Sequence, residues 1–167
     1  MMKNIYEWSK KDRALYFAVL FPFAVAFIGT AYLLATAAPY LAAIFIVLYV
    51  AVNVFQAGCC VGCPYRGGYC PPVFGLYLAN FLSSQIYNNR SFEQGFFKVN
   101  ANLAELFLIC TLLFPVYWLV SLNWLYLLGF LLLILMHAAL FFPSMCTKCS
   151  YNDTCPGGQM TLKLLKR

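Results

Sequence analysis

Two long stretches of this chain contain no charged side chain, and they limit its fold more than any other feature. No Asp, Glu, Lys or Arg lies between Arg13 and Arg66, or between Glu105 and Lys148, so the stretches are 52 and 42 residues long. A membrane-spanning helix needs about 20 apolar residues. Each stretch therefore has room for two such helices and a short turn.

Composition favours lipid as the solvent around these helices. Hydrophobic residues make up 63% of the chain and charged residues only 10%, whereas soluble domains carry about 25% charged residues. We place one pair of helices at residues 14–34 and 41–57, and a second pair at 102–120 and 124–142. The turns within the pairs are then residues 35–40 and 121–123.

The basic residues predict the topology, because four spanning helices place all of them on one side of the membrane. They lie in the N-terminal, middle and C-terminal segments, namely Lys3, Lys10, Lys11, Arg13, Arg66, Arg90, Lys98, Lys148, Lys163, Lys166 and Arg167. Lys and Arg favour the cytoplasmic side during insertion. We therefore expect cytoplasmic N and C termini in a bacterial or archaeal inner membrane. The net charge of +6 suits anionic lipid headgroups, and we expect no nucleic-acid partner.

A cysteine pattern occurs once in each half of the chain. The first run is Cys60-x2-Cys63-x6-Cys70-Pro71, and the second is Cys146-x2-Cys149-x5-Cys155-Pro156. Both runs begin where the second helix of a pair is expected to end. The sequence thus predicts an all-α integral membrane fold of two tandem hairpin repeats, each followed by a cysteine-rich loop. Residues 72–87 are short for a span, so we expect an interfacial or re-entrant helix there.

The repeat also predicts how the chain is organised into domains. Residues 1–98 would hold the first hairpin, its cysteine loop and the interfacial helix. Residues 99–167 would hold the second hairpin, its cysteine loop and the basic tail. Together they would form one compact membrane domain.

Seven cysteines on or beside the cytoplasmic loops are the candidate functional residues. They are Cys59, Cys60, Cys63, Cys70, Cys146, Cys149 and Cys155. Cytosolic thiols are kept reduced, so this clustering favours metal ligation or redox chemistry over structural disulfides. Zinc takes four tetrahedral ligands, and an iron–sulfur cluster takes four cysteines in motifs that often end in Cys-Pro. The pattern leaves the metal open.

Ligand counting separates the two runs. With Cys59, the first run supplies four cysteines, whereas the second supplies three and needs a further ligand from Cys59, Asp153, a water or a partner. A single shared site with a Cys-x2-Cys pair from each half is the alternative. The element Cys59-x3-Cys63-Pro64 resembles the Cys-x3-Cys-Pro element of membrane-bound ferredoxin-type proteins. That likeness is confined to these few residues, and no family is assigned from it.

Two further residues are candidates for contact with a cofactor. Arg66 lies within the first cysteine loop, where its charge would stabilise thiolates or a cluster. His137 is the only histidine and lies in a membrane helix, where it would form an interhelical hydrogen bond or contact a cofactor. Cys110 stands alone within a helix, and we expect it to serve packing.

These residues predict a metal-binding membrane protein, in the first place an iron–sulfur electron-transfer or accessory subunit. It would act beside a larger membrane or redox partner, or as a homo-oligomer. The alternatives are a zinc-stapled scaffold or assembly factor and a thiol–disulfide membrane oxidoreductase. No Ser-His-Asp set, P-loop or paired-carboxylate pattern supports a hydrolase or a nucleotide-dependent enzyme, and no catalytic residue is assigned.

Overall fold

Four long helices dominate the structure, a computed structural model that describes residues 5–152 and 155–164. They are α1 (Lys10–Ala37), α2 (Pro39–Cys59), α4 (Gln94–Leu122) and α5 (Trp124–Phe141). Each is long and apolar enough to cross a membrane. The described residues contain no strand, so the predicted all-helical membrane fold with four candidate spans is confirmed.

The helices extend beyond the apolar stretches that predicted them. α1 begins before residue 14 because Ser9 and Asp12 form a capping box: Ser9 Oγ accepts from Asp12 N at 3.2 Å, and Asp12 Oδ2 accepts from Ser9 N at 3.1 Å. α4 begins at Gln94 rather than residue 102. A polar residue thus marks the end of the apolar segment but not the end of the helix.

Each pair of helices is joined by a single extended residue, which is shorter than the predicted turns. Ala38 has φ −163° and ψ 129°, and Asn123 has φ −171° and ψ 129°. Pro39 then opens α2, where its missing N–H costs no helical hydrogen bond. The Asn123 side chain accepts from Leu125 N at 3.0 Å and caps α5.

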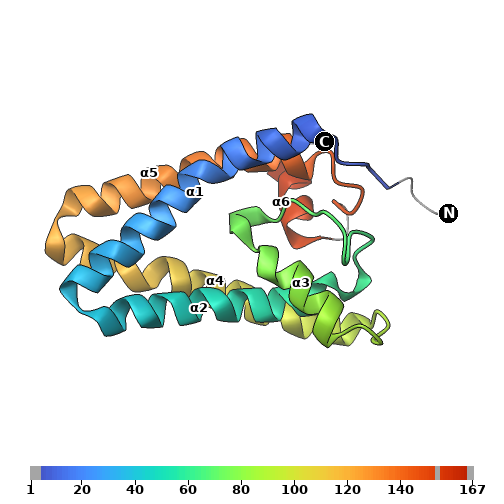
Figure 1. Cartoon of the computed structure of the whole chain (residues 1–167), viewed down its shortest axis with the longest axis horizontal. Coiled ribbons are helices and arrows are strands. Elements are labelled where there is room, and N and C mark those ends of the chain that lie inside the picture. Colours follow the sequence, from blue (N-terminus) through green and yellow to red (C-terminus); the bar gives the residue numbers. More distant parts are fainter. Residues whose placement is uncertain (1–4, 153–154, 165–167) are drawn as a thin grey trace.

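The helices pack so that the two hairpins form one bundle. α2 packs mainly against α4, and α1 packs mainly against α5. Both hairpin turns lie at one end of the bundle, and the N-terminal and C-terminal segments lie at the other (Figure 1). We call these the turn end and the loop end. Lys3, Lys166 and Arg167 lie outside the described residues.

The shorter elements gather at the loop end (Figure 1). They are η1 (Cys60–Gly62), η2 (Val73–Gly75), α3 (Tyr77–Ile86), a π-helical turn η3 (Phe142–Cys146) and α6 (Pro156–Leu164). α3 is the short helix predicted within residues 72–87. All seven candidate cysteines lie in or between these elements, or at the last residue of α2.

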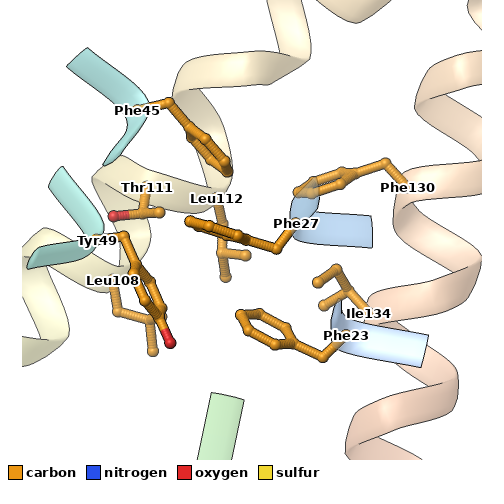
Figure 2. Close-up of a pocket in the computed structure, with 9 residues that line it drawn as sticks. All are labelled: Phe23, Phe27, Phe45, Tyr49, Leu108, Thr111, Leu112, Phe130 and Ile134. Carbon is orange, nitrogen blue, oxygen red and sulfur yellow. The ribbon is translucent and has the colours of Figure 1, made fainter. Parts of the chain in front are cut away.

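Aromatic side chains fill the middle of the bundle (Figure 2). The Phe27 ring lies 4.9 Å from the Phe45 ring and 4.6 Å from the Tyr49 ring, measured between centroids. The cavity that remains between these rings has a volume of about 10 Å³, close to the size of one water probe. It is too small for an organic ligand.

The outer surfaces of the long helices are apolar and exposed, as a bilayer requires. Phe21 on α1, Val47 on α2 and Leu135 on α5 are each more than 60% exposed. Cys110 is also exposed, on α4. The packing role expected for Cys110 is therefore wrong, because its thiol faces outward from the bundle.

Candidate functional site

The two cysteine loops lie together at the loop end. Each of the other six candidate cysteines is close enough to Cys155 for the two thiols to interact electrostatically. Cys155 belongs to the second loop, whereas four of its neighbours belong to the first. The loops therefore meet in one thiol-rich region, and all seven thiols are free.

Two sets of four cysteines interact electrostatically in every pair: Cys60, Cys63, Cys70 and Cys155, and the set in which Cys149 takes the place of Cys60. Only the second set takes two members from each loop. We call this set, Cys63, Cys70, Cys149 and Cys155, the thiol quartet. It differs from the shared site that the sequence left open as an alternative, because Cys70 and Cys155 take the places of Cys60 and Cys146.

The loops rest on a buried, mostly aromatic cluster, half of whose buried members belong to the long helices. Its buried members are Trp8, Tyr16, Val19, Tyr65, Phe141 and Met145, and Cys63, Cys70, Cys146 and Cys149 pack against it. Desolvation in this setting raises the pKa of Cys63 to about 11 and raises the pKa values of Cys70 and Cys149 as well. The three thiols are therefore protonated at neutral pH, and a metal ion that binds them displaces protons.

The thiols do not converge on a single point. Within residues 5–152 and 155–164, no three His, Cys, Asp or Glu side chains lie close enough together to hold one metal ion. Asp153, a predicted ligand for the second run, lies outside the described residues. The role of the seven cysteines as ligands stays a prediction.

Hydrogen bonds and an ion pair fix the second loop against the first loop and the N-terminal segment. Ser150 Oγ accepts from Tyr65 Oη at 3.2 Å and from Tyr6 N at 2.7 Å. Lys148 Nζ donates to Asp12 Oδ1 at 2.7 Å, and the Asp12 side chain is only 7% exposed. The relative position of the two loops is thus set by polar contacts as well as by apolar packing.

Backbone between the first cysteine loop and α3 inserts into the bundle. Phe74 N donates to His137 Nε2 at 3.2 Å, and Phe74 O accepts from Tyr49 Oη at 2.7 Å. Pro72 O accepts from Tyr16 Oη at 2.9 Å. Backbone groups buried away from water need such partners, because an unpaired N–H or C=O is costly. Side chains of α1, α2 and α5 therefore hold the segment that follows Cys70.

His137 supports this inserted segment and does not contact a cysteine. It is fully buried, its Nδ1–H donates to Val19 O at 2.8 Å, and its Nε2 accepts from Phe74 N. The predicted interhelical hydrogen bond is therefore present, between α5 and α1. Both ring nitrogens are engaged by backbone, and a role in cofactor binding stays a prediction.

Arg66 lies between α3 and the thiols. Its Nη2 donates to Ser83 O at 2.9 Å, in the last turns of α3, and this carbonyl also accepts from Tyr87 N at 3.2 Å. Its guanidinium also interacts electrostatically with Cys60. This position is compatible with the predicted role of Arg66 beside an anionic centre. That role stays a prediction.

The sequence did not identify three residues that hold the inserted segment, namely Tyr16, Tyr49 and Asn53. Asn53 Oδ1 accepts from Ala79 N at 3.2 Å and thereby caps the start of α3. Its Nδ2 donates to Tyr49 O at 3.0 Å. An amide in the middle of an apolar helix was a usable signal for Asn53. Tyrosines are common in such helices and gave no signal.

Three buried polar groups at the loop end have no hydrogen-bond partner among the described residues: Trp8 Nε1, Tyr69 Oη and Ser83 Oγ. Most buried donors in native proteins are bonded, so unpaired ones call for an explanation. A serine in a helix can reach its own backbone by rotating its side chain. The rigid rings of Trp8 and Tyr69 have no such alternative.

An open pocket of about 250 Å³ reaches one member of the thiol quartet. Its lining residues are Gly67, Gly68, Tyr69, Cys70, Tyr77, Asn80, Phe81 and Ser84. Asn80 fixes the glycine pair, because its side chain accepts from Gly67 N at 3.1 Å and donates to Gly68 O at 2.8 Å. Cys70 is the one cysteine in this lining, so it borders both the thiol region and the exterior.

Comparison of the chain with models of protein families, with curated proteins and with solved structures finds no match. The function is therefore argued from the loop end itself.

Proposed function

We propose that this is a membrane-bound iron–sulfur protein in which one cluster lies between the two cysteine loops. The proposed ligands are the thiol quartet, Cys63, Cys70, Cys149 and Cys155. The observation that carries the proposal is that two thiols from each loop interact electrostatically, and that Cys63, Cys70 and Cys149 pack against the same buried cluster. An iron–sulfur cluster is typically held by four cysteines.

The sequence around the quartet favours a cluster over a single zinc ion. Three of the four quartet cysteines are followed by a proline, at Pro64, Pro71 and Pro156. Iron–sulfur motifs often end in Cys-Pro.

The surroundings of the quartet also suit a centre that carries negative charge. Arg66 lies beside Cys60, and the Arg13 guanidinium lies 4.5 Å from the centre of the Tyr69 ring. Trp8 and Tyr69 offer unpaired donors. When bound, the cluster would supply one-electron transfer, and the protein residues would hold it and limit its access to water.

The composition of the purified protein tests this proposal. The protein is purified without oxygen in mild detergent, and its visible spectrum, iron, zinc and acid-labile sulfide are measured. We expect broad visible absorbance with iron and sulfide, and the same result for Cys110→Ala, whose thiol faces outward. Colourless protein with stoichiometric zinc would support the scaffold instead. Metal-free protein with Cys-x2-Cys disulfides would support the oxidoreductase.

We further propose that the loop end faces the cytoplasm and meets a larger redox partner there. The basic residues of the described segments lie at this end, and such residues favour the cytoplasmic side. A fluorescent reporter that matures only in the cytoplasm, fused to the C-terminus, tests the orientation. Fluorescent cells are expected. Dark cells, combined with activity of a reporter specific for the other side, would contradict the orientation.

We also propose that the two hairpins are tandem copies of one unit. The matching single-residue turns at Ala38 and Asn123 support this. So do Pro22 and Pro115, which are both buried within the first helix of their hairpins. A parallel repeat of this kind relates its halves by an axis along the membrane normal and would bring both cysteine loops to one face.

A further inference from the structure

Trp8 is held at the loop end by the extended segment that precedes α1. The neighbouring Tyr6 donates its backbone N–H to Ser150 Oγ at 2.7 Å, in the second cysteine loop. The Trp8 ring lies 5.0 Å from the Tyr6 ring and 6.2 Å from the Tyr65 ring, between centroids. Only 8% of Trp8 is exposed, in the aromatic cluster against which three members of the thiol quartet pack.

The indole N–H of Trp8 has been removed from water without receiving an acceptor. Tyr69 Oη is in the same position, and Tyr69 directly precedes Cys70 in the chain. Its ring is oriented by the Arg13 guanidinium above it. The region of the thiols thus contains two donors on rigid rings that have no partner among the described residues. One comes from the N-terminal segment and the other from the first loop.

The chemistry of these two groups limits what can bind them. An indole nitrogen only donates, and the Tyr69 phenol is available as a donor. A protonated thiol is a weak acceptor, whereas a metal-bound thiolate or an inorganic sulfide carries negative charge and accepts more strongly. Both groups are therefore donors of the kind that can bond to the sulfur atoms of an iron–sulfur cluster.

We propose that Trp8 Nε1–H and Tyr69 Oη–H donate hydrogen bonds to sulfur atoms of the centre between the loops, and so act as positioning residues that set its reduction potential. This inference rests on the proposed function. Hydrogen bonds to the sulfurs are among the features that tune such potentials. The reduced cluster carries one more negative charge than the oxidised one, so the donors stabilise the reduced state more. Loss of either donor lowers the midpoint potential.

Two conservative substitutions isolate the donors. Trp8→Phe keeps an aromatic ring in the cluster and removes the N–H, and Tyr69→Phe keeps the ring beneath Arg13 and removes the O–H. Trp124→Phe is the matched control, because Trp124 is 63% exposed at the turn end. Metal content and helix content are measured first for each full-length protein in detergent, followed by a redox titration.

We expect all four proteins to bind iron and sulfide equally, with lower midpoint potentials for Trp8→Phe and Tyr69→Phe and an unchanged potential for Trp124→Phe. Potentials equal to wild type in both loop-end variants would overturn the inference while leaving the proposed function intact. A folded loop-end variant that binds no iron would also overturn it, because that residue would then be needed for assembly. A wild-type protein without a cluster would refute the proposed function and this inference together.

Discussion

The two ends of the bundle are built in different ways. At the turn end, Ala38 and Asn123 each reverse the chain alone, with the same extended backbone. Aromatic side chains such as Trp124 and Tyr40 are exposed there, as is typical of a membrane interface. At the loop end, irregular backbone enters the bundle, and Tyr16, Tyr49 and His137 bond to it.

This difference teaches which residues the structure depends on. Apolar helices joined by a short turn tolerate many sequences, because each helix satisfies its own backbone. The inserted segment at the loop end depends on individual side chains, because each free backbone group there has one particular partner. The same kind of substitution should therefore cost more at the loop end than at the turn end.

The largest effect is expected for His137→Phe. This change leaves Phe74 N without its acceptor and Val19 O without its side-chain donor. A buried group left unpaired costs about 1–3 kcal/mol, so we expect the free energy of unfolding to fall by about 3 kcal/mol. Thermal unfolding in detergent measures it. Asn123→Ala, which removes the cap of α5 at the turn end, should cost about 1 kcal/mol. Equal losses would contradict the comparison.

A smaller effect is expected where α2 and α4 approach each other. A Cβ added at Gly58 would overlap the Asn100 side chain, whereas one added at Gly129 would meet no atom within 4 Å. Gly58→Ala should lower the free energy of unfolding by about 2 kcal/mol, since overpacking costs about 1–3 kcal/mol. Gly129→Ala should be neutral or stabilise by up to about 1 kcal/mol. A Gly58→Ala variant that is as stable as wild type would contradict the close contact between the helices.

The smallest effect is expected for the ion pair that joins the second loop to α1. Lys148→Met breaks the contact with Asp12, but the Lys148 side chain is 39% exposed, so the loss should stay below about 1 kcal/mol. Glu93→Gln breaks the exposed pair with Arg90, which is 3.7 Å long, and leaves the Arg90 guanidinium over the Phe96 ring, so it should cost less than about 0.5 kcal/mol. Chemical denaturation compares the two. A larger loss for Glu93→Gln than for Lys148→Met would contradict the assigned contacts.

The sequence predicted the four helices because uncharged stretches of that length have few alternatives. It misplaced the start of α4, because Gln94 and the polar residues after it continue the helix beyond the apolar segment. It predicted turns of several residues where Ala38 and Asn123 suffice. These errors share a cause: hydropathy locates the lipid-facing part of a helix, whereas capping and packing decide where the helix ends.

The sequence predicted which cysteines belong to the candidate site, but not how they are arranged in space. Spacing along the chain left two arrangements open: separate sites with four cysteines in the first run and three in the second, or one shared site of Cys60, Cys63, Cys146 and Cys149. The thiol quartet instead includes Cys70 and Cys155, because each loop folds back and brings its last cysteine among the others. The donors on Trp8 and Tyr69 had no signal in the sequence, since their lack of a partner is a property of the packed structure.

The most direct test of a site shared by both loops is the iron content of Cys155→Ala, measured with acid-labile sulfide against wild type and Cys110→Ala. Cys155 is the neighbour that all other candidate cysteines have in common. A shared site predicts that Cys155→Ala loses iron and sulfide together while Cys110→Ala retains both. Full retention of iron in Cys155→Ala would mean that the four cysteines of the first loop suffice alone, and would contradict the shared site.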